Sequence, residues 1–115
     1  MTPLIAIIDY GAGNLRSIQR ALEAAGARVT ITSEPSEIVA ARGVVFPGVG
    51  NAGAAMERLR AMNIPPAIEQ AVHDRKPFLG ICLGMQLMFE YQEEGETQGL
   101  GLLPGSVRTL APQVK

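Results

Sequence analysis

The chain has 115 residues, 47% of them hydrophobic and 18% charged, with a formal net charge of −1 at pH 7. This composition is typical of a folded globular domain and excludes an intrinsically disordered chain. No run of like charge is longer than a pair such as Glu93-Glu94, so charge gives no support for binding to nucleic acid, an anionic membrane or an acidic partner.

The first residues, "MTPLIAIIDYG", carry no basic leader and hold only five apolar residues in a row. We therefore expect that these residues form neither a signal peptide nor a membrane span. The simplest expectation is a cytoplasmic protein. Along the rest of the chain, short apolar runs alternate with helical patterns. The patterns predict strands over residues 4–9, 28–32, 43–46, 77–81 and 106–110. They predict helices from Asn14 to a stop at Gly26 and over residues 33–41, 54–62, 65–74 and 82–91.

Strands that alternate with helices predict an α/β fold, here a flavodoxin-like parallel sheet with helices on both faces, in one domain over residues 1–115. The strands are continuous apolar runs, as expected when helices cover both faces of a sheet. Functional groups of such folds collect beyond the carboxyl ends of the strands. Three segments follow strand ends and are expected at this edge: "DYGAGN", "PGVG" and "GICLGM".

The only cysteine, Cys82, lies in the pattern Gly80-Ile81-Cys82-Leu83-Gly84. Small residues two before and two after a nucleophile allow a strained strand-to-helix turn. Such a turn exposes the sulfur at a helix N-terminus, which favours the thiolate. It also leaves the backbone N–H of Leu83 free to face an oxyanion. The alternative is a buried structural cysteine, because free cysteine is often buried.

We call the turn at residues 80–84 the elbow. The segment "PGVG", residues 47–50, follows the predicted strand over residues 43–46 and is expected beside the elbow, at the same edge of the sheet. Glycines at positions 48 and 50 permit unusual backbone angles, which would aim an N–H at a developing negative charge. The alternative is an ordinary tight turn.

Taken together, "IIDYGAGNLRS", "FPGVG", "GICLGMQLMFEYQEEGE" and "GLGLLPGSV" resemble the class I glutamine amidotransferases over essentially the whole chain. The resemblance implies hydrolysis of glutamine to glutamate and ammonia, with no metal or organic cofactor. Within the family, the "DYGAGN" opening is similar to members of histidine biosynthesis that feed ammonia to a separate (β/α)₈-barrel cyclase subunit. This chain would be the N-terminal portion of the amidotransferase fold.

The resemblance also implies roles for individual residues. Cys82 matches the family nucleophile, and Asn14 matches the surface that faces the cyclase. The oxyanion hole and the glutamine pocket are matched by Val49, Gly50, Leu83, Gln86 and Glu94. A carboxylate such as Glu94 suits the ammonium group of glutamine, and Gln86 lies one helical turn beyond Cys82. Without the resemblance, Glu94 would be interpreted as a solvated charge and Gln86 as a polar residue on a partly exposed helix.

The resemblance also implies a downstream His-x-Glu pair, in which the histidine is the general base and the glutamate carboxylate orients it. These 115 residues do not contain that pair. The only histidine, His73, is expected at the opposite edge of the sheet from Cys82, beyond hydrogen-bond reach. We therefore expect a domain that is incomplete at its C-terminus, exposes apolar surface and hydrolyses glutamine very poorly alone. A natural short protein that keeps the elbow as a binding site is the other possibility.

Three other functions are compatible with parts of the sequence. One is an amidotransferase subunit that feeds ammonia to a different synthase. Another is a flavodoxin-like binding or redox-sensing module with a reactive Cys82. A dinucleotide site at "GAGNLRS" is only weakly supported, because Arg16 replaces the third glycine of the G-x-G-x-x-G motif.

Overall fold

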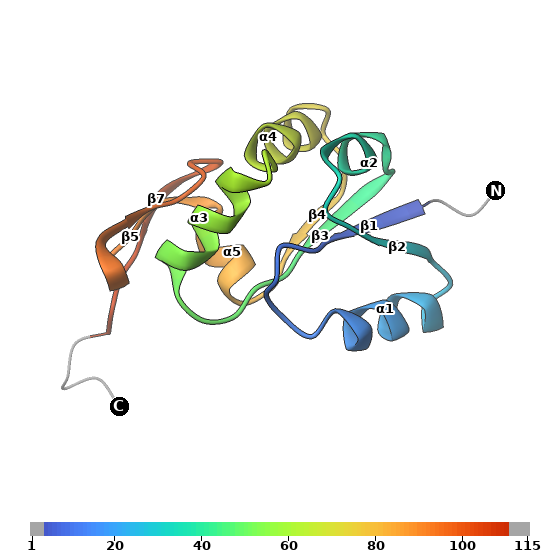
Figure 1. The fold of residues 1–115 in the computed structure, drawn as a ribbon, viewed down its shortest axis with the longest axis horizontal. Helices are drawn as coiled ribbons and strands as arrows, with labels where there is room; N and C mark the ends of the chain where they lie inside the picture. Colours follow the sequence, from blue (N-terminus) through green and yellow to red (C-terminus); the bar gives the residue numbers. More distant parts are fainter. Residues whose placement is uncertain (1–3, 111–115) are drawn as a thin grey trace.

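Four parallel strands form the central sheet (Figure 1). The computed structural model describes residues 4–110. The strands are β1 (Leu4–Ile8), β2 (Arg28–Thr32), β3 (Gly43–Phe46) and β4 (Phe78–Gly80). Their spatial order is β2-β1-β3-β4. Parallel pairing places Ile7 of β1 between Ile31 of β2 and Val45 of β3. For these four strands the predicted ranges are confirmed, with differences of at most one residue at the ends of β1 and β4.

Helices cover both faces of this sheet, as predicted. They are α1 (Leu15–Ala24), α2 (Pro35–Ala40), α3 (Ala52–Ala61), α4 (Pro65–His73) and α5 (Leu83–Leu87). Figure 1 shows α2, α3 and α4 on one side of the sheet and α1 on the other. Asn14 caps α1 by accepting a hydrogen bond from the Ser17 N–H at 3.3 Å, and Gly26 follows the helix with φ +99°.

The core lies between the sheet and the three helices on one face. It buries Ile8 and Phe46 from the strands together with Leu59 and Ile68 from the helices. The Phe46 ring packs against Tyr10 at a centroid distance of 5.6 Å and against Phe78 at 6.2 Å. Aromatic pairs at such distances add to the stabilisation that burial provides.

The other face of the sheet is covered only in part. α1 lies over it, and a groove of about 240 Å³ is left open beside β4, lined in part by Ile5, Val45 and Leu79. Leu79 is 53% exposed. The expected exposure of apolar surface is therefore confirmed. Within residues 4–110, no helix is long and apolar enough to cross a lipid bilayer.

A second, smaller sheet corrects two predictions. The helix predicted over residues 82–91 ends at Leu87, and β5 (Phe89–Gln92) follows it. The strand predicted over 106–110 is instead β7 (Leu103–Val107), and it pairs with β5 rather than extending the central sheet. β6 (Thr97–Gln98) completes the sheet, after the short helix η1 (Glu94–Glu96).

Backbone pairing explains why α5 stops early. The carbonyls of Leu87 and Met88 accept hydrogen bonds from the N–H groups of Leu100 and Leu102, each at 2.8 Å. These carbonyls would otherwise continue the helix. The returning chain can approach this closely because Gly99 has no side chain: a Cβ there would lie 2.2 Å from the Phe89 oxygen.

Candidate active site

The three glycine-containing segments meet at the carboxyl edge of the central sheet, as predicted. The Tyr10 hydroxyl, after β1, donates a 2.7 Å hydrogen bond to the carbonyl oxygen of Pro47, after β3. The Leu83 N–H, in the elbow after β4, donates to the Gly48 carbonyl at 3.1 Å. Burial raises the pKa of Tyr10 to about 12, an effect that the nearby Arg58 guanidinium partly opposes. The phenol is therefore a neutral donor at ordinary pH.

The elbow has the strained geometry that its glycines predict. Cys82 has φ 54° and ψ −121°, a conformation that costs a non-glycine residue about 1–3 kcal/mol. A Cβ on Gly84 would lie 1.9 Å from the Phe46 carbonyl oxygen, and a Cβ on Gly80 would lie 2.8 Å from Cα of Met85. Both glycines are thus required by close backbone packing. The thiol of Cys82 is free and exposed, so the alternative of a buried structural cysteine is wrong.

The loop of residues 47–50 lies beside the elbow, but its two glycines have different functions. Gly50 has φ +91°, the left-handed region that favours glycine. Gly48 has an ordinary φ, contrary to the prediction. It must be glycine for reasons of space, because a Cβ there would lie 2.2 Å from the Tyr10 hydroxyl oxygen.

The prediction of a free Leu83 N–H is wrong for this conformation. That N–H is taken up by the Gly48 carbonyl, which caps the first turn of α5. The close packing of Gly84 on the end of β3 brings the Gly48 carbonyl over the start of the helix. An incoming oxyanion would have to displace this carbonyl.

A cavity of about 160 Å³ adjoins the elbow and collects four of the predicted site residues: Gly50, Leu83, Gln86 and Glu94. The remaining lining residues are Ala52, Gln92, Val107, Arg108 and Thr109. Gln92 is 2% exposed, and its Nε2 donates to the Gln86 carbonyl at 2.6 Å, which ties the second sheet to α5. The cavity offers carboxamide, carboxylate and guanidinium groups to a small polar ligand.

Three other predicted residues lie outside this cavity. Cys82 and Val49 are near it in sequence, and Val49 is 59% exposed. Asn14 lines a separate groove of about 590 Å³ with Asp9, Arg16 and Gln19, beyond the carboxyl end of β1. Its side chain also has the structural function of capping α1.

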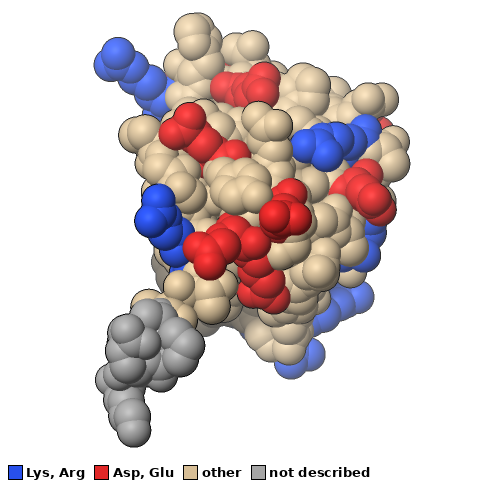
Figure 2. All heavy atoms as spheres, turned by 90° about the vertical axis from the view of Figure 1, so that its left-hand side faces the viewer, with Lys and Arg blue, Asp and Glu red and all other residues tan. Residues whose placement is uncertain are grey.

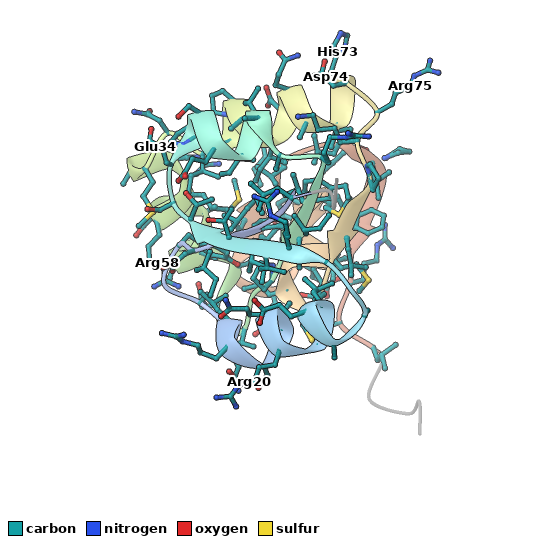
Figure 3. The ribbon with its side chains drawn as sticks, turned by 90° about the vertical axis from the view of Figure 1, so that its right-hand side faces the viewer. Arg20, Glu34, Arg58, His73, Asp74 and Arg75 are labelled. Carbon is teal, nitrogen blue, oxygen red and sulfur yellow. The ribbon has the colours of Figure 1, made fainter. Side chains whose placement is uncertain are left out.

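His73 does not lie near Cys82. It is exposed at the end of α4, before β4 begins, whereas Cys82 follows the end of that strand. Figure 3 shows His73 beside Asp74 and Arg75 at the periphery of the molecule, with its side chain turned outward. Among residues 4–110, no three His, Cys, Asp or Glu side chains come together to hold a metal ion.

Sequence reasoning missed the contributions of the second sheet to the cavity. Gln92, Arg108 and Thr109 reach it because β5 pairs with β7, placing Gln92 opposite Val107. No local pattern marks these residues.

Acidic side chains gather on the end of the molecule that carries this sheet, as Figure 2 shows.

The fold is similar to solved structures of low sequence identity. One, described as a glutamine amidotransferase, superposes with a TM-score of 0.69 at 17% identity, covering 86% of this chain and 52% of the other. Another, a putative peptidase E protein from Listeria monocytogenes, gives a TM-score of 0.70 at 15% identity, covering 88% of this chain and 63% of the other. At this identity the likeness shows the fold alone.

Relatives in sequence are much more similar. A subunit named imidazole glycerol phosphate synthase subunit HisH from Synechococcus elongatus is 52% identical over 93% of this chain and 49% of its own length. The subunit of the same name from Gloeobacter violaceus is 53% identical over 93% of this chain and 47% of its own length. The chain thus spans about half the length of the curated relatives that it matches.

The model of the family glutamine amidotransferase class-I matches residues 6–103, nearly all of the described chain. This range includes the Cys82 elbow, the loop of residues 47–50 and the cavity residues Gln86 and Glu94. The chain therefore belongs to the class I glutamine amidotransferases.

Proposed function

We propose that this chain carries the nucleophile and part of the glutamine site of a glutaminase. The carrying observation is the exposed Cys82 thiol, held on a strained turn beside a cavity lined by Gln86 and Glu94. The sulfur attacks the side-chain carboxamide carbon of glutamine, and the C–N bond breaks to release ammonia. Water then hydrolyses the γ-glutamyl thioester to glutamate and restores the thiol.

Gln86 and Glu94 hold the glutamine in this proposal, with Glu94 paired to its ammonium group. The backbone of Val49, Gly50 and Leu83 forms the oxyanion hole. Because Leu83 N–H is bonded to the Gly48 carbonyl, the Gly48–Val49 peptide has to turn before an oxyanion can bind. The same turn would present the Val49 N–H, since one peptide unit carries both groups.

The proton of the Cys82 thiol has to move to the leaving nitrogen, which needs a group that acts first as general base and then as general acid. The only histidine of these 115 residues lies away from Cys82. We therefore expect the chain alone to turn over glutamine very slowly.

The names of the relatives support a more specific assignment. We propose that the glutaminase belongs to imidazole glycerol phosphate synthase of histidine biosynthesis and forms a heterodimer, in the cytoplasm, with a (β/α)₈-barrel cyclase subunit. The groove around Asn14 lies at the same sheet edge as the elbow, which suits a partner that receives ammonia there.

The test is glutamate release from glutamine, with and without the cyclase subunit and its nucleotide ligand, using Cys82→Ala as control. In parallel, glutamine should protect Cys82 from alkylation by iodoacetamide, which is unambiguous because the chain has one cysteine. Release that requires Cys82, or protection by glutamine but not by an unrelated amino acid, supports the proposal. Absence of both effects overturns it and favours the redox-sensing alternative, for which peroxide should oxidise Cys82.

A further inference from the structure

The turn that carries Glu94 to the cavity has an uncommon backbone conformation. It is the short helix η1, which connects β5 to β6. Gly95 has φ 73° and Glu96 has φ 44°, so two successive residues lie in the left-handed region. Glu96 is strained there, because this region favours glycine. The turn therefore depends on contacts from outside itself to keep its shape.

Thr97, the first residue of β6, supplies one of these contacts. Its Oγ1 donates a hydrogen bond to the Gly95 carbonyl at 3.0 Å. Backbone pairing holds Thr97 itself, which lies opposite the buried Gln92 in the antiparallel ladder between β5 and β6. The hydroxyl thus links the turn to the second sheet.

The same hydroxyl lies against the start of α3. A Cβ on Gly53 would lie 3.3 Å from the Thr97 Oγ1 and 3.1 Å from the Asn51 Oδ1, both closer than ordinary van der Waals contact. Asn51 caps α3 by accepting a hydrogen bond from the Ala54 N–H at 3.0 Å. The glycine at position 53 therefore allows Thr97 to approach the first turn of this helix.

Thr97 joins two segments that line the cavity beside the elbow. Glu94 lines it from the turn, and Gly50 and Ala52 line it from the segment that leads into α3. Of residues 94–97, only Glu94 lines the cavity. An effect of Thr97 on a bound ligand would therefore pass through Glu94.

We propose that Thr97 is a positioning residue: its hydroxyl holds η1 against the start of α3 and so fixes the Glu94 carboxylate relative to the loop of residues 47–50. This inference rests on the proposed glutaminase function. Without the hydroxyl the strained turn relaxes, so Glu94 occupies its place for a smaller fraction of the time. Glutamine then binds more weakly, in proportion to that fraction.

The test measures how well glutamine protects Cys82 of the 115-residue chain from alkylation by iodoacetamide. The concentration of glutamine that halves the alkylation rate is determined for each variant. Thr97→Val removes the hydroxyl at nearly constant volume, and Thr97→Ser keeps it. Thr30→Val in β2 is the matched control, because the same atoms change in the other sheet. Melting curves verify that each variant is folded at the temperature of the assay.

We expect Thr97→Val to raise the half-protection concentration about fivefold, the effect of losing one hydrogen bond. The alkylation rate without glutamine should stay unchanged, since the hydroxyl bonds to the turn and not to the elbow. Thr97→Ser and Thr30→Val should resemble the original chain. In glutamate release with the cyclase subunit, Thr97→Val should raise KM by a similar factor and keep kcat.

Gly53→Ala tests the same contact from the side of α3. Alanine favours a helix more than glycine does, so the helix itself gains stability. The new Cβ would crowd the Thr97 Oγ1 and displace the turn. We expect a higher half-protection concentration without a lower melting temperature. An unchanged half-protection concentration would overturn the contribution of α3.

An unchanged half-protection concentration in Thr97→Val overturns the inference, as does an equal rise in Thr97→Ser or in Thr30→Val. Each of these results leaves the glutaminase proposal in place, because glutamine still protects the original chain. If the original chain shows neither protection nor glutamate release that requires Cys82, the glutaminase proposal falls and this inference falls with it. The two failures are therefore distinguishable.

Discussion

The hydroxyl of Tyr10 donates a hydrogen bond to the carbonyl oxygen of Pro47, across 2.7 Å and between segments 37 residues apart. The phenol occupies the space that a side chain at position 48 would need. Its ring packs on Phe46 at the end of β3. The bond thereby joins the loop after β1 to the loop that lies against the Cys82 elbow.

Replacing Tyr10 by phenylalanine should lower the free energy of unfolding by about 1–3 kcal/mol, because the buried Pro47 carbonyl loses its partner. Denaturant unfolding of the variant and the original chain measures the difference. Tyr91→Phe is the control, since the Tyr91 side chain is 40% exposed. An equal effect of the two substitutions would contradict a specific contribution of the Tyr10 hydroxyl.

Tyr10 should also make stability fall at alkaline pH. Burial raises its pKa to about 12 in the folded chain, from an ordinary value of 10.0. Its contribution is complete below pH 10, where both states keep the proton. Between pH 10 and 12 the unfolded chain loses the proton first, and the free energy of unfolding falls by up to about 1.4 kcal/mol per pH unit. This part of the pH dependence should be absent from Tyr10→Phe.

Gly84→Ala should be among the most damaging single changes in the chain. Its Cβ would lie 1.9 Å from the Phe46 oxygen, so the elbow or β3 must move. We expect a loss of more than about 3 kcal/mol or failure to fold. Gly101→Ala is the control: Gly101 has φ +68° with no heavy atom within 4 Å of a Cβ, and strain there should cost only about 1 kcal/mol. Similar losses at both positions would refute overlap as the cause.

Lys76 should stabilise the fold as a hydrogen-bond donor rather than as a surface charge. Its Nζ donates to the carbonyls of Val39 and Ala41, which lie two residues apart at the C-terminal end of α2. Lys76→Met keeps much of the side-chain volume and leaves these carbonyls without the donor. We expect a loss of about 1.5–3 kcal/mol in urea unfolding, against almost none for Arg20→Met on the surface of α1.

Substitutions of Asn14 can separate the stability that its cap gives to α1 from its contribution to binding a partner subunit. Asn14→Ala should cost about 1 kcal/mol through loss of the cap on α1, and Asn51→Ala should cost a similar amount at α3. Asn14→Ser keeps a capping oxygen and should leave the thermal midpoint nearly unchanged. Weaker binding of the proposed cyclase partner by Asn14→Ser would then report on the interface alone. Unchanged binding would place Asn14 outside it.

The fold of the central sheet follows from local sequence. The ranges predicted for β2 and β3 match the structure, because β-branched and apolar runs bounded by turn residues favour buried strands whatever their neighbours. The positions of Gly80 and Gly84 around Cys82 predicted the strained turn, since only small residues permit that packing.

Tertiary contacts decided the rest. Whether residues 88–91 continue a helix depends on which groups bond to the carbonyls of Leu87 and Met88, and those partners come from residues 100–103. The pairing of β5 with β7 brings Gln92 and Arg108 to the cavity. Leu83 of the elbow and Glu94 line this same cavity. The sequence by itself determined the four strands of the central sheet and the strained elbow around Cys82. Only the tertiary structure determined which distant side chains share its cavity, because backbone pairing between separate segments leaves no local pattern in either one.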